Sequence, residues 1–211
     1  MEKYILWDWN GTLLDDVTIT MQSANTLLKK YHLPQIKSLE EYRKKFFFPI
    51  EAYYKTLGFN FSKTPYNQLA QEFIEIYQSL LSQCQLNNQA QKILQFFQEQ
   101  GFKQIIISAS KKEPLIAQVC FHKIDHYFQQ ILGIETIYAK SKIHIAQNWQ
   151  QEHCIQAKNM VFIGDTFHDY EVAKALNCFC ILYQNGHQLV TKKDAPKANF
   201  ISSLWDASLF L

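Results

Sequence analysis

The sequence predicts an α/β protein with a doubly wound parallel sheet and an inserted all-helical segment. Short apolar runs typical of strands alternate with amphipathic helical patterns over the second half of the chain. Parallel strands need long crossover connections, so this alternation indicates a parallel sheet covered by helices on both faces. A long stretch after the first apolar run has helical patterns only, which indicates a separate small unit.

Four short runs rich in Ile, Val, Phe and Leu are expected to form the strands, at residues 4–7, 103–108, 159–164 and 179–183. Helical patterns separate the later runs, at residues 89–100, 113–121, 142–152 and 170–177. Gly101 directly follows the first of these patterns, which is typical of a helix C-terminus. The order of strand, helix and strand therefore predicts parallel pairing.

Residues 16–84 lie between the first two predicted strands. Apolar side chains at helical spacing define two faces there, with Val17, Met21, Ala24 and Leu28 on one and Leu69, Phe73, Ile76 and Leu80 on the other. Thr64 and Pro65 are placed as the N-cap and first turn of the second helix, after a turn at 57–61. Extra helices packed on the core are the weaker interpretation, because a parallel crossover needs only one helix. We expect a helical cap at 16–84 over the carboxyl edge of a core formed by 1–15 and 85–211.

Composition argues against several classes of protein. Hydrophobic residues make up 47% and charged residues 19% of the 211 residues, which predicts a folded globular protein. The formal net charge is +2 without a run of basic residues, so we expect no nucleic-acid partner. No apolar stretch approaches the roughly 20 residues that span a bilayer, and the first residues do not resemble a signal peptide. We therefore expect a cytoplasmic protein without membrane contact; its oligomeric state is not indicated.

The five cysteines have no CxxC spacing. This spacing predicts neither a disulfide framework nor a zinc cluster, and free thiols are expected.

Chemistry is expected where the strands end, because the carboxyl ends of parallel strands collect loops and helix N-termini. The polar residues at these ends are Asp8, Ser108 and Asp165. Asp8 precedes Gly11-Thr12, and a carboxylate in such a loop can be a nucleophile toward phosphorus. Taken alone, Asp before Gly-Thr is more often a turn.

A second acidic motif follows the strand predicted at 159–164. Asp165 comes directly after Gly164, and Asp169 lies four residues further on, at the start of a helix. With Asp8, these carboxylates form a hard oxygen site that suits Mg²⁺. Either acid alone has another interpretation, as a helix N-cap or a first-turn acid.

Two further groups suit phosphate binding. Ser108 lies at the strand end in IIISAS, where its hydroxyl and nearby backbone N–H groups can hold a phosphoryl oxygen. Lys142 opens a helix and can neutralise charge on the phosphate and on the nucleophile. Lys140 is an alternative to Lys142.

Together, these motifs resemble the haloacid dehalogenase superfamily over essentially the whole chain. The series of that family is an Asp loop with Gly-Thr, a strand-end Ser or Thr, a Lys before a helix, and GDTxxD. This sequence has the series in order, as DWNGT, IIISAS, Lys142 and GDTFHD. The helical segment resembles the cap of the phosphoglycolate phosphatase-like branch. The resemblance implies a Mg²⁺-dependent phosphatase that hydrolyses a small phosphorylated metabolite, with phosphoglycolate as the first candidate, through an aspartyl phosphate.

By this resemblance, Asp8 would be the nucleophile. Asp8, Asp165 and the main-chain carbonyl of Asn10 would hold Mg²⁺, and Asp169 would support the water shell of the metal. Asp15 would fix the hinge toward the cap and would not react.

The resemblance also implies how the phosphoryl group is bound. Ser108, Ala109 and Lys142 would hold it, and Thr12 would lie beside it. Lys142 fits the family pattern better than Lys140 because Ser141-Lys142 opens a helix.

Asn10 departs from the family pattern. Phosphatases of this family normally have an aspartate there, which protonates the leaving oxygen and later activates water. Asn10 cannot titrate, so the change should spare the metal site while removing acid–base help worth roughly 10²–10⁴-fold. A good leaving group, such as that of an acyl or aryl phosphate, or another proton donor such as His168, would compensate for this loss.

Two other functions stay open. Phosphonate hydrolases of the superfamily lack this aspartate and form a Schiff base with a cap lysine, for which the candidates are Lys29, Lys30, Lys44 and Lys45. A binding or regulatory protein with poor turnover is the alternative from a different class. Dehalogenation fits poorly, because GDTFHD keeps metal-binding acids that dehalogenases do without.

Two segments each have two interpretations. Residues 46–49, FFFP, could line the inner face of the cap or form its own core. Residues 185–187, NGH, resemble a loop of this branch and fit a plain turn equally well.

Overall fold

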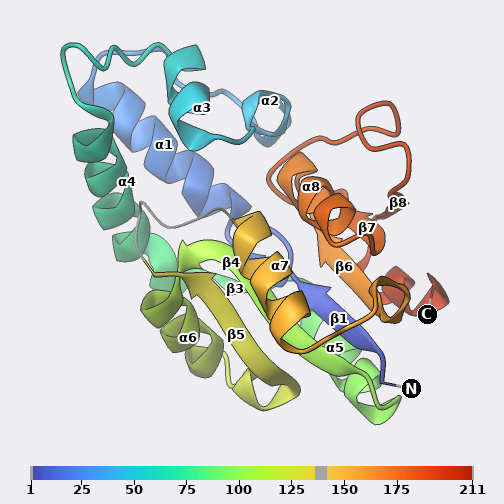
Figure 1. Ribbon diagram of the computed structural model, residues 1–211. Helices are drawn as coiled ribbons and strands as arrows, with labels where there is room; N and C mark the ends of the chain where they lie inside the picture. The colour runs from blue at the N-terminus through green and yellow to red at the C-terminus, as the bar shows by residue number, and fades with distance from the viewer. Residues whose placement is uncertain (1, 136–141, 211) are drawn as a thin grey trace.

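The computed structural model describes residues 2–135 and 142–210 and has a six-stranded parallel sheet at its core (Figure 1). The strand order is β5-β4-β1-β6-β7-β8. The bounds are β1 Tyr4–Trp7, β4 Lys103–Lys111, β5 Phe128–Ile134, β6 Met160–Gly164, β7 Phe179–Tyr183 and β8 Asn199–Ile201. The chain starts in the middle of the sheet with β1, adds β4 and β5 on one side, and then adds β6, β7 and β8 on the other. This is the predicted doubly wound arrangement.

Helices cover both faces of the sheet. Ile5 and Trp7 of β1 pack in the same core cluster as side chains of α5 (Ala90–Glu99) and α6 (Lys112–Phe121). Tyr4 and Leu6 pack in a second cluster, with α7 (Lys142–Glu152) and α8 (Phe167–Ala175). Successive side chains of a strand point to opposite faces, so a strand buried on both faces has an unbroken apolar sequence. Short 3-10 turns complete the core at Asp125–Tyr127, Ala157–Asn159 and Leu204–Phe210.

The sequence does not predict the edge strands β5 and β8. In β5, Gln129 is exposed and Gln130 half-buried, so no continuous apolar run marks this strand. β8 has only three residues. Several predicted boundaries also differ, most of all at β4, which continues past Ser108 to Lys111, and at α8, which begins at Phe167. Edge strands are covered by one neighbour only, which weakens their apolar signal.

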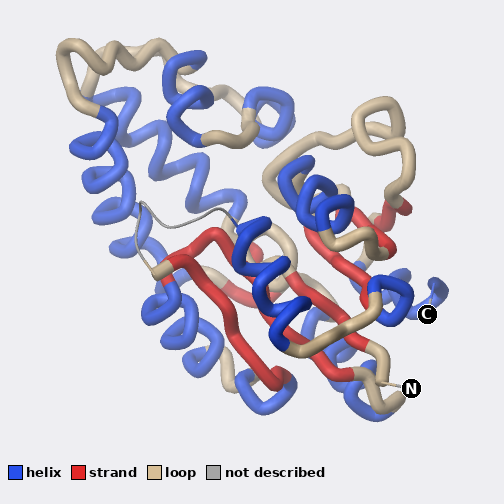
Figure 2. Tube along the Cα trace, in the orientation of Figure 1, coloured by secondary structure: helices blue, strands red, loops and turns tan. Residues whose placement is uncertain are grey.

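Residues 16–84, all of which the structure describes, form helices and loops and no strand (Figure 2). The helices are α1 Val17–Lys30, α2 Leu39–Lys45, α3 Ile50–Thr56 and α4 Tyr66–Leu80, followed by a 3-10 turn at Leu81–Gln83. They pack around a hydrophobic cluster of their own. The α4 helix begins one residue later than expected, because Pro65 has an extended ψ of 142° and is itself the N-cap. No helix in the described ranges is long and apolar enough to cross a membrane.

The chain leaves the sheet for these helices through one segment and returns through another, and the two segments pair as a short antiparallel ribbon. It pairs β2 (Leu14–Asp15) with β3 (Gln85–Leu86). Next to it, the buried Asn87 side chain donates hydrogen bonds to the carbonyl oxygens of Gly11 and Thr12, at 3.2 and 2.6 Å. The ribbon therefore ties the base of the helical segment to the loop after β1.

Candidate active site

Three neighbouring strands bring the predicted site residues together. Asp8 follows β1, Asp165 follows β6 and Ser108 lies in β4, while Lys142 begins α7. Since β4, β1 and β6 are adjacent, their carboxyl ends share one edge of the sheet. The Asp8 N–H donates to the Ile163 carbonyl at 2.8 Å, which fixes the loop after β1 against β6.

Asp8, Asp165 and Asp169 form one buried acidic cluster. Each offers a carboxylate oxygen, and these oxygens all lie within 4.8 Å of one another. Burial raises the pKa of the Asp8 carboxyl to about 6, although Lys142 opposes this rise. Burial also raises the pKa of Asp165 well above its usual value. The positive charge around the cluster is thus too small to keep all three carboxyl groups ionised easily.

Lys142 is the cation inside this cluster. Its ammonium is buried and donates to Asp8 and, at 2.5 Å, to Asp169. Burial alone would lower the pKa of Lys142, but Asp169 and Asp8 outweigh burial and raise it. Burial likewise acts against ionisation of Asp169, and the ion pair with Lys142 reverses this and lowers the pKa of Asp169. The nucleophile candidate and a cation are therefore in direct contact.

Asp165 is held by the loops after β1 and β7. It accepts hydrogen bonds from the Thr12 hydroxyl at 2.9 Å and from the His187 N–H at 2.5 Å. A Cβ on Gly186 would collide with this carboxylate. Gly11 has a φ of 73°, and a Cβ there would lie 2.6 Å from the same carboxylate. Both glycines allow the backbone to approach Asp165 closely.

Asp169 has two roles at once. One of its carboxylate oxygens accepts from the Thr166 N–H and hydroxyl, at 2.8 and 2.7 Å, and the Thr166 side chain caps α8 in return. The other oxygen pairs with Lys142. Thr166, not Asp165, is therefore the N-cap, and the first-turn interpretation of Asp169 is correct alongside its place in the cluster.

The acidic cluster fits a divalent cation of the Mg²⁺ type. Three buried carboxylates with oxygens this close repel one another, and among the described residues Lys142 is the one lysine that pairs with them. Mg²⁺ in proteins is usually held by the hard oxygens of one or two carboxylates, together with waters and substrate phosphates. The chemistry of the donor set therefore agrees with the expected metal.

Both polar atoms of the Asn10 side chain, the amide nitrogen and the amide oxygen, form hydrogen bonds. Its amide nitrogen donates to the Asp16 carboxylate at 2.8 Å and to the Tyr77 hydroxyl at 3.1 Å. Its amide oxygen accepts from the Ser110 hydroxyl at 2.7 Å. These partners come from the start of α1, from α4 and from β4. Asn10 thus connects the loop of Asp8 to the helical segment.

Asp16 and His187 form a buried pair that the sequence did not single out. The distance from His187 Nε2 to Asp16 Oδ1 is 3.0 Å, and His187 Nδ1 lies 2.9 Å from the Tyr42 hydroxyl. Burial acts to lower the pKa of His187, but Asp16 outweighs this and raises it to about 9. The sequence signal for Asp16 was its place directly before α1, where an acid is favoured. No local pattern marked His187 as its partner.

The loop after β7 also binds the helical segment through Arg43 of α2. The Arg43 guanidinium donates to the carbonyl oxygens of Gly186 and Asn185, both at 2.8 Å. In return, the Leu189 N–H donates to the Arg43 carbonyl at 2.9 Å. The segment 185–187 is therefore a contact between sheet and helices, so the plain-turn interpretation is incomplete.

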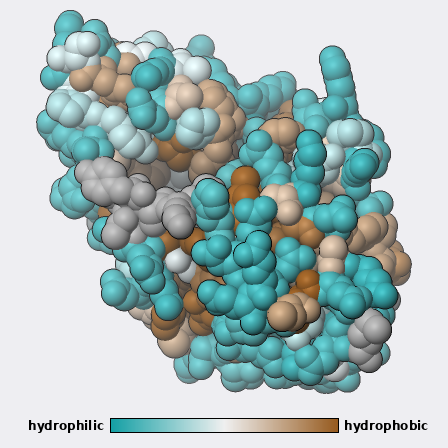
Figure 3. Space-filling model, in the orientation of Figure 1, coloured by the Kyte–Doolittle hydropathy of each residue, from teal (hydrophilic) through white to brown (hydrophobic). Residues whose placement is uncertain are grey.

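A cavity of about 690 Å³ lies between the helical segment and the carboxyl edge of the sheet. Asp8, Ser108, Ala109 and Lys142 lie on its wall, as do Asn10 and Asp169. Aromatic side chains of the helical segment line the other side. Figure 3 shows apolar residues around α3 and in the hollow beneath it. The position of the cavity makes it the candidate substrate site.

The remaining predicted residues differ in their access to this cavity. The Thr12 hydroxyl is fully buried between the Asp8 and Asp165 carboxylates, and Thr12 does not line the cavity. Asp15 is exposed and lies in the β2–β3 ribbon. Lys140 lies outside the described residues, so the alternative between it and Lys142 is unaddressed, although Lys142 does contact Asp8.

The alternative lysines and His168 also differ in their access to the cavity. The four lysines considered for a Schiff base are exposed, and none lines the cavity: Lys29, Lys30, Lys44 and Lys45. His168 does line it, and its ring lies 5.1 Å from that of Phe48. Phe46 and Phe48 line the cavity and also belong to, or pack on, the hydrophobic cluster of the helices, so both interpretations of FFFP hold.

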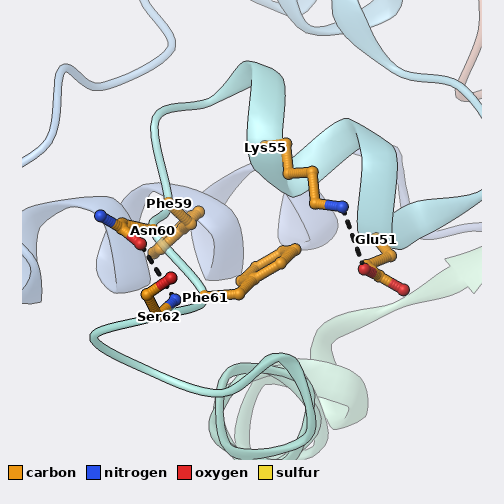
Figure 4. A pocket seen from close by; sticks show the side chains of 6 residues that line it. All are labelled: Glu51, Lys55, Phe59, Asn60, Phe61 and Ser62. Carbon is orange, nitrogen blue, oxygen red and sulfur yellow. Dashed lines mark hydrogen bonds and ion pairs between the residues drawn. The ribbon is translucent and has the colours of Figure 1, made fainter.

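A second hollow, of about 590 Å³, lies on the outer side of α3 (Figure 4). It is lined by Glu51, Lys55 and residues 59–62. Lys55 pairs with Glu51 at 3.2 Å, and the Ser62 N–H donates to the Asn60 side chain at 2.9 Å. Its charged side chains are thus paired with each other and are largely exposed, so this hollow is not the candidate site.

Comparison with known proteins agrees with this geometry. A family model described as haloacid dehalogenase-like hydrolase matches residues 5–183. A phosphoglycolate phosphatase from Aliivibrio fischeri is 25% identical over 97 residues, a match that spans 44% of this chain and 43% of that protein. The chain therefore matches less than half the length of this curated relative.

Two solved structures have the same fold over nearly their whole length. A predicted phosphoglycolate phosphatase from Haemophilus somnus 129PT has a TM-score of 0.77 at 18% identity, covering 99% of this chain and 97% of that one. A haloacid dehalogenase-like family hydrolase from Streptococcus pneumoniae has a TM-score of 0.76 at 20% identity, covering 100% and 99%. Since the family model spans most of the chain, the protein belongs to the haloacid dehalogenase-like hydrolases.

Proposed function

We propose that this hydrolase is a phosphatase that cleaves a small phosphomonoester by way of a phosphoryl group carried on Asp8. The observation that carries the proposal is the Asp8 carboxylate, which is buried, contacts Lys142 and lies on the wall of a large cavity. The curated relative named phosphoglycolate phosphatase supports a small phosphorylated substrate.

The proposed metal is Mg²⁺, held by Asp8, Asp165 and the main-chain carbonyl of Asn10. Asp169 would support the water shell of the metal, as its contact with the cluster suggests. When bound, Mg²⁺ supplies positive charge that stabilises the phosphoryl oxygens during transfer.

In the first step, a carboxylate oxygen of Asp8 attacks phosphorus. The new O–P bond forms as the bond to the leaving oxygen breaks, and the electron pair departs with that oxygen. Lys142 offsets the charge of Asp8 and of the phosphoryl group, and the Ser108 hydroxyl and the Ala109 N–H donate to phosphoryl oxygens. Thr12, which contacts the Asp8 and Asp165 carboxylates, keeps them oriented.

In the second step, water attacks phosphorus and the bond to Asp8 breaks. Inorganic phosphate and a proton are released, and the Asp8 carboxylate is restored. Asn10 takes no part in proton transfer, because an amide does not titrate and its hydrogen-bonding groups are occupied by Asp16, Tyr77 and Ser110. The leaving oxygen therefore departs as an anion, or takes its proton from water or from His168, which lines the cavity.

We propose further that residues 16–84 are a cap domain on a core of residues 1–15 and 85–211. The helices have a hydrophobic cluster separate from those of the sheet, and the β2–β3 ribbon provides a narrow connection. Arg43 and Tyr42 contact the loop after β7 and would hold the cap against the core. A closed cap excludes water from the site.

A second candidate function is a binding or regulatory protein with poor turnover. The occupied side chain of Asn10 favours it, because no titratable group stands at this position. Asp8, Lys142 and the two further acids would then retain a phosphorylated ligand without releasing phosphate at a useful rate.

Phosphate release separates these candidates. We expect release from acetyl phosphate, a small acyl phosphate, with Mg²⁺ present, and loss of release with a chelator or with Asp8→Asn. Release that persists in Asp8→Asn would contradict the site assignment. Release no greater than this blank in the natural protein would favour the binding function.

A further inference from the structure

The cavity wall opposite Asp8 is built mainly from aromatic rings. They come from the helical segment and its loops and include Phe46, Phe48, Tyr53, Tyr54, Phe73 and Tyr77. Their positions are fixed by ring contacts, with centroid distances of 5.2 Å for Phe46 and Tyr53 and 6.1 Å for the stacked Phe73 and Tyr77. Such walls suit a flat apolar group, which gains both burial and ring stacking.

The residues that line the cavity offer little unpaired positive charge to an anionic leaving group. Among the described residues that line the cavity, those from 16–84 include the acids Asp16 and Glu51 but no lysine or arginine. On the sheet side, Lys142 is engaged with Asp8 and Asp169. The histidines that line the cavity are paired as well, His187 with Asp16 and His168 with Glu171. Lys111 also lines the cavity, but it is exposed at the end of β4, where water screens its charge. A carboxylate on the substrate would therefore find weak compensation.

Tyr53 adds a second, independent sign of an organic ligand. This residue is 2% exposed and lines the cavity, and its hydroxyl has no hydrogen-bond partner among the described residues. Buried hydroxyls in folded proteins nearly always have a partner. A polar atom of a ligand in the cavity would supply one.

Asn10 restricts the leaving group by its chemistry. Asn10 supplies no proton to the leaving oxygen, so the reaction favours leaving groups that are weak bases. A phenol has a pKa of about 10, whereas the pKa of an alcohol is far higher, because an alcohol is about as weak an acid as water. An aryl phosphate thus needs no proton donor, while an alkyl phosphate such as phosphoglycolate does.

These observations converge on one class of substrate. Resting on the phosphatase function proposed above, we propose that the substrate is an aryl phosphomonoester whose uncharged aromatic group lies against the rings of the helical segment. The Asp8–phosphorus bond forms as the bond from phosphorus to the aryl oxygen breaks. The electron pair stays on the aryloxide, which takes a proton from water after release.

The test compares kcat/KM with Mg²⁺ for 1-naphthyl phosphate, phosphoglycolate and acetyl phosphate. We expect 1-naphthyl phosphate to exceed phosphoglycolate by on the order of tenfold or more. Phe73→Ala removes one ring of the wall and should lower the ratio of 1-naphthyl to acetyl phosphate by about tenfold. Phe61→Ala, a change of the same kind at a helical-segment ring outside this cavity, should leave the ratio unchanged.

The outcomes separate the substrate class from the function. Hydrolysis of acetyl phosphate above the Asp8→Asn blank, with 1-naphthyl phosphate no better than phosphoglycolate, would overturn the substrate class and leave the phosphatase function standing. Hydrolysis of none of the three above the blank would overturn both. If Phe73→Ala does not fold, the comparison of substrates in the natural protein still decides.

Discussion

The side-chain amide of Asn10 donates a hydrogen bond to the carboxylate of Asp16, with 2.8 Å between Nδ2 and Oδ2. Asp16 is buried, accepts from Tyr77 and pairs with His187. A second carboxylate at position 10 would face Asp16 in a site that is poor in water, whereas an amide can donate to it. Asn10 therefore connects the loop of Asp8 to the helical segment, and this position carries no acid.

Asn10→Asp should restore acid–base chemistry and change the dependence on the leaving group. We expect hydrolysis of an alkyl phosphate to gain up to about 10²–10⁴-fold, because the new carboxyl group can protonate the leaving oxygen. An aryl phosphate should gain less, since its leaving group needs no proton. The ratio of kcat/KM for the two esters measures this effect, with Asn10→Ala as the control that supplies no acid. An equal gain for both esters would count against the assigned role.

Lys142→Met should destabilise the protein strongly. The substitution leaves the Asp8 and Asp169 carboxylates buried without their cation, a change that typically costs about 3–5 kcal/mol. Urea unfolding with a chelator present measures the loss. Lys44→Met breaks an exposed pair with Glu40, which water screens, so its unfolding midpoint should stay close to that of the natural protein. Equal unfolding midpoints for the two variants would contradict a structural ion pair at Lys142.

Gly186→Ala should weaken metal binding, because the added Cβ would collide with the Asp165 carboxylate. We expect a lower Mg²⁺ affinity by calorimetry and a stability loss of about 1–3 kcal/mol. Gly101→Ala is the matched control: its added Cβ meets open space, and only its φ of 79° makes it costly, by about 1–2 kcal/mol. Unchanged Mg²⁺ affinity in Gly186→Ala would argue against Asp165 as a ligand.

Arg43→Gln should loosen the contact between α2 and the loop after β7. The variant loses the guanidinium hydrogen bonds to Gly186 and Asn185, each worth about 0.5–1.5 kcal/mol. Hydrogen exchange should become faster at the Leu189 amide, which donates to the Arg43 carbonyl. Lys55→Gln, on the outer side of α3, should leave this amide unaffected. Equal protection in both variants would show that Arg43 does not hold the two parts together.

Much of the fold could be predicted because the central strands are buried on both faces. The bounds of β1, β7 and α7 agree with the sequence prediction to the residue. The edge strand β5 was not predicted, because it is only partly buried at the rim of the sheet and its sequence has no continuous apolar run. Helix starts were less certain, as at α8, where the Thr166–Asp169 capping box moves the start to Phe167.

The site was predictable where the chain carries its own motif. Asp8, Asp165 and Asp169 follow strands or open a helix, and the sheet order alone brings them together. Asp16 and His187 were missed because they are 171 positions apart and no periodicity links them. Their pairing depends on how the helical segment sits above the sheet. Of the aromatic cavity wall, the sequence indicated FFFP at 46–49, and the rings of α3 and α4 were missed for the same reason.

The central claim is that Asp8 carries the phosphoryl group, and trapping that species tests it most directly. The natural protein is mixed with acetyl phosphate and Mg²⁺, quenched in acid, digested and examined by mass spectrometry. The account predicts one added phosphoryl group on the peptide that contains Asp8, and none in Asp8→Asn or with a chelator. A phosphoryl group on another residue, or phosphate release without any phosphorylated peptide, would contradict it.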